Sequence, residues 1–433
     1  WLQDRPAHDP QHLVPRVRLL SPRRFHAPTP QPPLVLPGQP QMQSPRSNEQ
    51  LIQTLSELLL DRDLLKRCVV QSFDRARGEA EQLNRDGLKR FRTLLCWILD
   101  MPIEALGELE SNLTFDFDGS NSFDLNETYR LVKFHLREYH RALGGKTHLE
   151  IPRKTIAEAG YTIQRELGRG NQGVVKLGTA EDGTEVCIKY LRKEAMTSAI
   201  EEIQEEFRAL RELSCDRIAK VYQMFHDESC YYMVGEPYHG GDMLSMKSRA
   251  VAQGVSLTEA WYQNLFFQCF EAIEFMHKLA VIHCDIKEPN IMLKSKDLAS
   301  PEIVLIDFGL SRAMAGKQKH CGGTPGYIPP ETIERRTWHP RGDVFSMGVT
   351  LMQVVLDKSP PQGARTVETP GGIFVEGCQT LQDIWKATKE RVPPYHLLPM
   401  TMPGMSRLLR GALEKRMSER ITAPQALQHE WFA

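Results

Sequence analysis

Residues 281–293, VIHCDIKEPNIML, place polar side chains at fixed intervals within an apolar stretch. Asp285 stands two positions before Lys287 and five before Asn290. A second stretch, VLIDFGLS, places Asp307 at the end of a hydrophobic run, directly before Phe308 and Gly309. A single aspartate of this kind is more often a helix cap or an ion-pair partner. The fixed spacing of the whole set therefore carries the argument.

Three glycines form a G-x-G-x-x-G pattern, Gly168, Gly170 and Gly173, followed by Val175. Alone the pattern is weak, because dinucleotide-binding folds use it too. In this chain one predicted strand precedes the loop and another strand, rather than a helix, follows it. That order favours a hairpin that closes over phosphate groups, because glycine lets backbone amides come close to them.

A lysine follows on the next predicted strand, where the segment VCIK contains Lys189. It is either a solvated surface lysine or a cation that holds the α- and β-phosphates. In the second case a helix carboxylate would hold the lysine. The charged helix expected over 194–213 offers Glu206, because leucines one and two turns later mark its inward face. Glu202 shares that face and is the alternative.

The polar residues of the two opening stretches suit phosphoryl transfer. Asn290 and Asp307 supply an amide and a carboxylate oxygen, the kind of ligand that Mg²⁺ prefers. Asp285 is then available to orient a substrate hydroxyl or to accept its proton. Lys287 can neutralise the transferring γ-phosphoryl group.

The sequence resembles a eukaryotic protein kinase over residues 161–432, through GRGNQGVV, VCIK, HCDIKEPN, DFG, GTPGYIPPE, DVFSMG and RITAPQALQHEWF. The resemblance implies an α+β, bilobal protein kinase fold with a small β-rich N-lobe and a large α-helical C-lobe. It implies Asp285, Lys287, Lys189 and Glu206 as catalytic residues, with Mg²⁺ on Asn290 and Asp307. The nucleotide-binding set is then Gly168, Gly170, Gly173, Val175, Lys189, Glu236, Asn290 and Asp307.

Lys287 and Thr324 resemble the serine/threonine class, and YYMVGEPYHGGDML with ALQHEWF is most similar to the calcium-dependent and calcium/calmodulin-dependent groups. Cys284 departs from the family, where an arginine that binds an activation-loop phosphate is usual. Residues 312–323 contain no serine, threonine or tyrosine. Both absences indicate that phosphorylation of that segment does not switch the kinase on or off. A catalytic thiol is the alternative, although the transfer chemistry needs none.

Other positions carry further expectations from the resemblance. Gly235 stands where a bulky residue usually guards the pocket behind the adenine, so we expect sensitivity to inhibitors with a large aryl group. Cys187 replaces an alanine and keeps the position small. Asp343 and Arg420 are expected as structural anchors, with Glu331 able to pair with Arg420.

Residues 116–127, DFDGSNSFDLNE, have the ligand spacing of a calcium-binding EF-hand loop. The predicted Ca²⁺ ligands are Asp116, Asp118, Ser120, the Ser122 carbonyl, Asp124 and a bidentate Glu127. Asn121 replaces the usual glycine and is the best tolerated substitute for a left-handed turn. The alternative is a solvated acidic loop. The upstream segment around Asp74 has no acidic residues at the spacing of calcium ligands. It therefore predicts a second EF-hand loop, paired with the first, that binds no metal.

The expected organisation has four parts. Residues 1–47 hold eleven of the 28 prolines and predict a disordered tail, with a ligand for a proline-binding module as the alternative. Residues 48–143 predict an all-α, EF-hand-pair-like domain. Its first helix would be capped by Ser47 or Asn48, and further helices would cover 88–99 and 127–143. Residues 144–160 predict a linker, and 161–433 the catalytic domain.

Composition limits the other classes of function. A formal net charge of -1 gives no argument for nucleic acid, and no apolar run is long enough to span a membrane. Nine scattered cysteines favour reduced thiols and a cytoplasmic location. The leading hypothesis is thus a calcium-regulated serine/threonine kinase that uses ATP and Mg²⁺ on protein substrates, with Asp242 suggesting basic residues upstream of the acceptor. The alternative is a calcium-sensing pseudokinase scaffold; the pattern leaves the oligomeric state open.

Overall fold

The computed structural model describes most of the chain after the proline-rich segment. The described residues are 46–111, 115–116, 120–145, 151–170, 173–195, 215–279, 281–307, 312–313, 322–360 and 371–433. The predicted tail therefore lies almost entirely outside them. Residues 47–433 form one compact unit.

Four helices build the N-terminal part of this unit, α1 (Asn48–Leu60), α2 (Arg62–Arg77), α3 (Arg85–Leu99) and α4 (Leu125–Ala142). Ser47 caps α1 in a reciprocal pair of hydrogen bonds with Gln50, which satisfies two backbone donors of the first turn. Asp124 caps α4 in the same way, so this helix starts two residues before the predicted start. Two 3₁₀ turns, Ile103–Leu106 and Leu109–Ser111, precede the acidic loop.

The loops between α2 and α3 and before α4 pair with each other. Leu83 and Phe123 exchange two backbone hydrogen bonds of 2.8 Å in an isolated antiparallel bridge. Both side chains are buried in the apolar core of the helical domain, together with Phe91 and Leu131. The loops that precede α3 and α4 are thus joined through this bridge, while the EF-hand pair stays a prediction.

A five-stranded antiparallel sheet follows, in the order β1-β2-β3-β5-β4. Its strands are β1 (Tyr161–Gly170), β2 (Gly173–Ala180), β3 (Glu185–Arg192), β4 (Val221–His226) and β5 (Cys230–Gly235). Gly183, at a φ of 85°, makes the tight turn between β2 and β3. Part of the predicted linker is attached to this sheet, because His226 exchanges backbone hydrogen bonds with Pro152 and Lys154.

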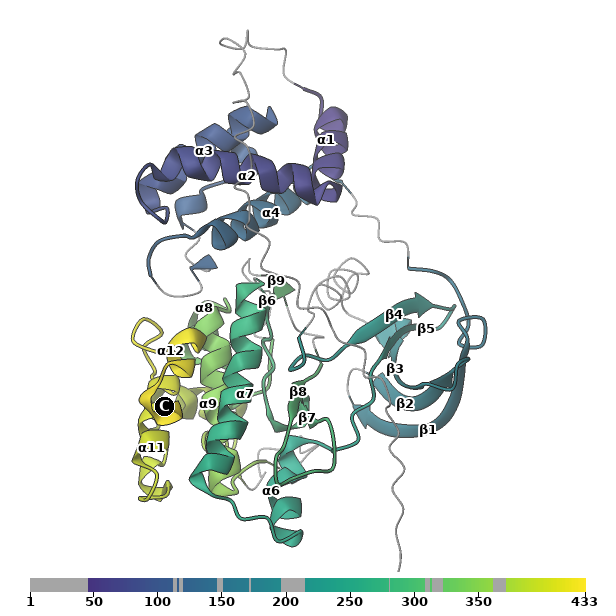
Figure 1. Cartoon of the computed structure of the whole chain (residues 1–433), viewed down its shortest axis with the longest axis vertical. Helices are drawn as coiled ribbons and strands as arrows, with labels where there is room; N and C mark the ends of the chain where they lie inside the picture. Colours follow the sequence, from purple (N-terminus) through teal and green to yellow (C-terminus); the bar gives the residue numbers. More distant parts are fainter. Residues whose placement is uncertain are drawn as a thin grey trace, which may run out of the picture. The chain divides into compact units, whose positions relative to one another are not determined.

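The remaining chain is mainly helical and forms a region separate from the five-stranded sheet (Figure 1). Its helices are α6 (Met243–Ala252), α7 (Glu259–Lys278), α8 (Pro330–Arg335), α9 (Pro340–Leu356), α10 (Leu381–Glu390), α11 (Pro403–Ala412) and α12 (Ala423–Leu427). Short strands β6 (Val281–Ile282), β7 (Ile291–Leu293), β8 (Ile303–Leu305) and β9 (Arg312–Ala313) pair β6 with β9 and β7 with β8.

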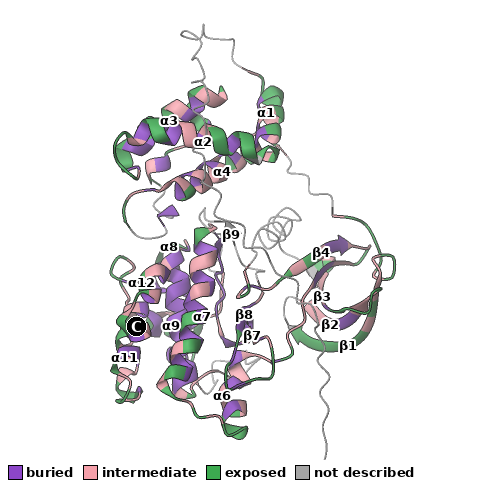
Figure 2. Ribbon diagram, in the orientation of Figure 1, coloured by how far each residue is buried: buried purple, intermediate pink, exposed green. Residues whose placement is uncertain are grey.

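Helix α9 forms the centre of this helical lobe. It is buried along almost its whole length, as Figure 2 shows, which explains why its sequence lacks a polar face. Its apolar side chains share one core with those of α7 and α11. The sheet-rich lobe and the helical lobe confirm the bilobal α+β architecture expected from the sequence.

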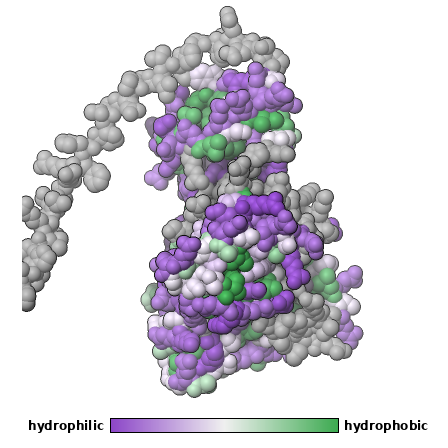
Figure 3. Space-filling model, turned by 90° about the vertical axis from the view of Figure 1, so that its right-hand side faces the viewer, coloured by the Kyte–Doolittle hydropathy of each residue, from purple (hydrophilic) through white to green (hydrophobic). Residues whose placement is uncertain are grey.

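Hydrophilic residues cover most of the described surface on the face shown in Figure 3, with hydrophobic residues scattered among them. Large exposed apolar side chains do occur, such as Leu60 and Met400, but an isolated residue of this kind is normal on a soluble surface. Among the residues that the structure describes, no helix combines the length and apolar composition needed to cross a membrane.

Candidate active site

The loop between β6 and β7 carries the polar residues that opened the sequence argument. Its backbone is fixed by Asp343, a buried carboxylate on α9, which accepts hydrogen bonds from His283 N (2.8 Å) and Cys284 N (3.0 Å). His277 of α7 lies 3.0 Å from the same carboxylate. Cys284 has a φ of 68°, the left-handed region that non-glycine residues seldom adopt. These contacts confirm Asp343 as a structural anchor and explain how the strained turn persists.

Asp285 follows this turn and lies at the centre of a hydrogen-bonded group. Lys287 Nζ is 2.8 Å from Asp285 Oδ2, and Thr324 Oγ1 donates to Asp285 Oδ1 at 2.5 Å. Lys287 Nζ also donates to Thr324 Oγ1 at 2.8 Å. The three side chains form a triangle that holds the carboxylate beside an ammonium and a hydroxyl. Sequence spacing predicted Asp285 and Lys287 together, and the fold adds Thr324.

Asn290 closes the other side of the loop. Its Nδ2 donates to the Asp285 carbonyl at 2.7 Å and reaches Asp285 Oδ2 at 3.2 Å. Because the amide nitrogen faces Asp285, the amide oxygen is oriented away from it. This orientation is compatible with the oxygen ligand that the sequence predicts, and the ligand role stays a prediction.

Lys189 reaches from the five-stranded sheet to the segment after β8. Its Nζ lies 2.6 Å from Asp307 Oδ1, although the two residues are 118 positions apart. Asp307 has a φ of 61°, so its backbone also takes the left-handed conformation. Glu206 and Glu202 lie outside the described residues, so the predicted carboxylate partner on the helix stays a prediction.

The glycine-rich segment forms the expected hairpin. Gly168 pairs with Val175, and Gly170 pairs with Gly173, so the loop joins two strands. Gly173 has a φ of 142°, and a Cβ there would overlap the carbonyl oxygen of Tyr190 on β3. Only glycine fits this position, which agrees with a hairpin rather than a dinucleotide-binding turn.

The end of β5 lies beside β3, the strand that carries Lys189. Gly235 pairs with Cys187 of β3, and the next residue, Glu236, donates its backbone N–H to the Lys220 carbonyl at 3.1 Å. A Cβ on Gly235 would stand 2.5 Å from that same carbonyl oxygen. The missing side chain therefore permits a close approach of the two backbone segments, and the open pocket expected behind the adenine stays a prediction. Burial raises the pKa of the Cys187 thiol to about 11, so it stays protonated and unreactive at neutral pH.

Two buried carboxylates brace the helical lobe. Glu331 accepts a bidentate pair from Arg420, with distances of 2.6 and 2.9 Å, as the sequence predicted. Glu288, directly after Lys287, was not predicted as a site residue. It accepts hydrogen bonds from Tyr327 (2.6 Å), Gln353 and Ser359 (both 2.8 Å), and burial raises the pKa of its carboxyl. Only its position inside the polar motif could have drawn attention to it.

The comparisons with known proteins agree with this geometry. The family model described as the protein kinase domain matches residues 161–432. The chain belongs to the protein kinase family.

Curated kinases resemble the chain at modest identity. Calcium/calmodulin-dependent protein kinase type 1 of Caenorhabditis briggsae is 33% identical over 215 residues, covering 48% of this chain and 58% of that protein. CDPK-related kinase 1 of Arabidopsis thaliana is 31% identical over 284 residues, with 63% and 46% covered. Death-associated protein kinase 2 of Mus musculus is 25% identical over 293 residues, with 66% and 75% covered. The matches thus span less than two thirds of the first two relatives.

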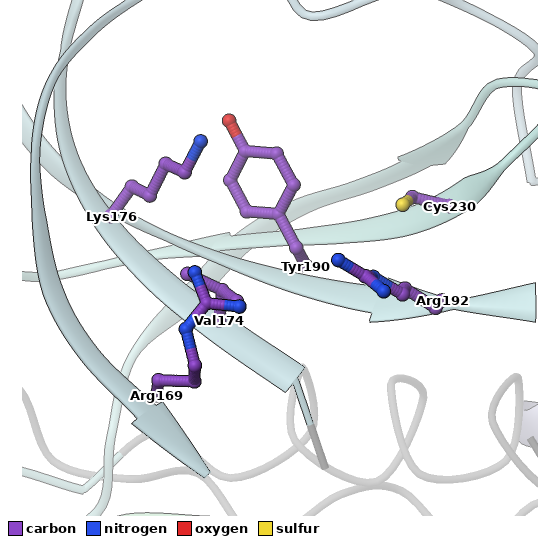
Figure 4. Close-up of a pocket in the computed structure, with 6 residues that line it drawn as sticks. All are labelled: Arg169, Val174, Lys176, Tyr190, Arg192 and Cys230. Carbon is purple, nitrogen blue, oxygen red and sulfur yellow. The ribbon is translucent and has the colours of Figure 1, made fainter. Parts of the chain in front are cut away.

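A pocket of about 190 Å³ on the kinase sheet lies away from this site (Figure 4). It is lined by Arg169, Val174, Lys176, Tyr190, Arg192 and Cys230. Side chains alternate across a strand, so Val174 and Tyr190 face away from their neighbours Val175 and Lys189. The pocket therefore occupies the opposite face of the sheet from Lys189 and contributes nothing to the phosphate site.

The acidic loop before α4 has part of the predicted calcium-site geometry. Asn121 has a φ of 59°, so asparagine does supply the left-handed turn, and its N–H donates to Asp116 Oδ2 at 2.9 Å. Glu127 Oε2 accepts from Asp124 N at 2.8 Å. Ser120 Oγ donates to the Ser122 carbonyl at 3.1 Å.

Asp118 lies outside the described residues, so the full predicted ligand set cannot be assembled from them. Over the part of the chain that the structure describes, no group of three or more His, Cys, Asp or Glu side chains is placed to hold a metal ion. Calcium binding by this loop thus stays a prediction.

Proposed function

We propose that the chain is a serine/threonine protein kinase that transfers the γ-phosphoryl group of ATP to hydroxyl groups of protein substrates. The triangle of Asp285, Lys287 and Thr324 carries this proposal. It places a carboxylate, a cation and an aliphatic hydroxyl within hydrogen-bond distance of one another. An acceptor serine or threonine of a substrate would offer the same kind of hydroxyl that Thr324 now offers to Asp285.

The residues of the triangle have separate tasks in the proposed transfer. Asp285 orients the acceptor hydroxyl and takes its proton as the oxygen attacks phosphorus. Lys287 stabilises negative charge on the transferring group, because its ammonium already lies beside Asp285. Thr324 holds both side chains in one geometry, which reduces the reorganisation needed when substrate arrives.

Lys189, Asp307 and Asn290 are suited to a magnesium–nucleotide complex. Asp307 offers carboxylate oxygens and Asn290 an amide oxygen, and this donor set fits a hard divalent cation. Magnesium, when bound, would neutralise phosphate charge. The Lys189 ammonium beside Asp307 would bind α- and β-phosphate oxygens, while the glycine hairpin from Gly168 to Gly173 would place backbone amides over them. Val175 and Glu236 would contact the adenosine end.

The proposal includes a preference for substrates with basic residues upstream of the acceptor serine or threonine. Asp242 Oδ1 caps α6 by accepting hydrogen bonds from Ser245 N (3.0 Å) and Ser245 Oγ (2.8 Å). Asp242 is therefore the N-cap of α6. Attraction of a substrate arginine is compatible with this capping role.

Calcium regulation through residues 116–127 is the finer part of the proposal. Three observations support it: the paired loops, the left-handed turn at Asn121, and the acidic residues Asp116 and Glu127 on either side of it. Glu127 Oε2 accepts a hydrogen bond from Asp124 N in the cap of α4. Glu127 would have to give up this hydrogen bond to bind calcium through both carboxylate oxygens. Calcium would therefore act directly on the start of α4.

The test compares phosphate transfer from ATP to a basic serine peptide in calcium and in chelator. An Asp285→Asn protein supplies the blank. We expect transfer above the blank, and a calcium response that Glu127→Gln abolishes. Absence of transfer on several peptides would favour the pseudokinase scaffold. Transfer that is equal with calcium and with chelator would remove the regulatory part alone.

The proposal also includes a reducing, cytoplasmic location. Eight cysteines fall among the described residues, and no disulfide bond joins any two of them. A scarcity of disulfide bonds is typical of reducing compartments. Localisation of a tagged full-length chain in its own cell type would check this, and recovery in an oxidising compartment would contradict it.

A further inference from the structure

The apolar core of the helical domain continues into the kinase domain. Four buried kinase residues, Ile282, Cys284, Ile328 and Trp338, belong to the same hydrophobic cluster as the core of α1–α4. Ile282 and Cys284 flank His283 at the start of the catalytic loop. The helical domain is thus packed against the segment that leads into Asp285.

Polar contacts fix the same interface. Asn126 Nδ2 donates to the Lys278 carbonyl at 2.9 Å, and Arg130 Nη1 donates to the Leu279 carbonyl at 2.8 Å. Lys278 ends α7 and Leu279 is its C-cap. The last carbonyls of a helix have no partner inside the helix, so a donor from outside stabilises them, and a cation does so most strongly. The first turns of α4 therefore complete the end of α7, just before β6.

A short chain of contacts links this cluster to Asp285. Trp338 Nε1 donates to the Gly322 carbonyl at 3.1 Å. A Cβ on Gly323 would stand 2.8 Å from the Cys284 carbonyl and 3.0 Å from the Trp338 ring, so both residues pack closely around this glycine. The next residue is Thr324, which holds Asp285 and Lys287.

Cys284 fits this environment because of its size and polarity. Its side chain is 1% exposed, within an apolar cluster. An arginine there would bury a cation, which is unfavourable unless an anion accompanies it. The Asp343 carboxylate already accepts from the backbone N–H groups of His283 and Cys284, and residues 312–323 contain no phosphate acceptor.

We propose that the helical domain positions the catalytic loop and the segment before Thr324, through apolar packing on Cys284 and Trp338 and through the contacts of Asn126 and Arg130 with the end of α7. It thereby takes the place of an arginine–phosphate contact as the element that fixes this region. The proposal rests on the proposed kinase activity for its kinetic readout. Asn126 and Arg130 are positioning residues that act through other groups.

The experiment uses the full chain with both polar contacts removed, Asn126→Ala with Arg130→Ala. Arg141→Ala is the matched control, because Arg141 lies on the same helix in an exposed pair with Glu138. We expect kcat to fall about tenfold in the double variant while KM for ATP is unchanged, because the nucleotide site is not altered. A purely structural role would lower the melting temperature without a fall in kcat at unchanged KM for ATP.

Hydrogen exchange of the two segments 281–293 and 322–338 gives a readout independent of catalysis. The double variant should exchange these amides about tenfold faster than the Arg141→Ala control below the unfolding temperature. Faster exchange together with the fall in kcat supports the inference. Unchanged exchange overturns it, whatever the activity. A wild-type protein that shows no transfer above Asp285→Asn would defeat the proposed function alone, because the exchange data would still decide this inference.

Discussion

Arg420 binds both carboxylate oxygens of Glu331, 89 positions away along the chain, in an ion pair that excludes solvent from the guanidinium. Its remaining N–H groups donate to backbone carbonyls, including those of Glu414 and Arg341. A buried charge pair stabilises a fold only when such additional bonds are present. This pair therefore ties the segment after Thr324 to the end of the chain.

Removing one partner of this pair should be strongly destabilising. We expect Arg420→Met to lower the free energy of unfolding by about 3–5 kcal/mol, because Glu331 is left as an uncompensated buried charge. Arg416→Met is the control, since Arg416 makes an exposed pair with Glu419 and its loss should change little. Denaturant unfolding of both variants measures the difference. Equal stability of the two variants would contradict the argument.

Thr324 is expected to matter for turnover more than for binding. Thr324→Val removes the hydroxyl that holds Asp285 and Lys287, so kcat should fall about tenfold to a hundredfold with little change in KM for ATP. Thr324→Ser keeps the hydroxyl and should restore most of the rate. Steady-state kinetics of the three proteins provide the measurement. A serine variant as impaired as the valine variant would show that the methyl group, and not the hydrogen bonds, is required.

Local spacing was enough to predict much of this site. Asp285, Lys287 and Asn290 lie within six positions, so one loop brings them together, and the predicted strand order around the glycines is that of the hairpin. The pairing of Glu331 with Arg420 was also expected, but only from the family resemblance. Spacing predicts such features because short segments have few ways to fold.

Contacts that depend on docking of distant segments were not predicted. From the sequence, Thr324 indicates only the serine/threonine class. Its hydrogen bond to Asp285 depends on how residues 322–324 pack against Trp338. The burial of Glu288 depends on Tyr327 and on helix α9. Periodicity gives the apolar face of a helix, yet it does not say which surface will cover that face.

His135 of α4 gives the helical domain a predictable sensitivity to acid. Burial, with Arg92 nearby, lowers the pKa of its imidazole from 6.5 to about 4, and its Nε2 has no hydrogen-bond partner among the described residues. The imidazole of His135 binds a proton near pH 6.5 in the unfolded chain, but only near pH 4 in the folded chain. The contribution of neutral His135 to the free energy of unfolding is therefore fully present above pH 6.5. It is lost as the pH falls toward 4, and the loss is about 2 kcal/mol at pH 5.

His135→Phe removes this titration while keeping an aromatic ring at the position. We expect the wild type to lose more stability than the variant between pH 7 and pH 5. Hydrogen exchange of the amides in α3 and α4 at both pH values measures the loss within the helical domain. An equal loss in the two proteins would mean that other groups cause the acid sensitivity.

Gly235 should make the kinase unusually sensitive to ATP-competitive inhibitors that carry a large aryl group. A methionine would fill the space behind the adenine, so we expect Gly235→Met to lose at least about tenfold in inhibitor potency. Any side chain at this position also displaces the Lys220 carbonyl, which would stand 2.5 Å from the new Cβ. Gly235→Ala is the matched control, because it has the same backbone conflict but fills little space. Inhibition curves at matched ratios of ATP to KM then separate size from backbone shift. Equal loss of potency in both variants would show that the displaced backbone, rather than the open pocket, determines inhibitor sensitivity.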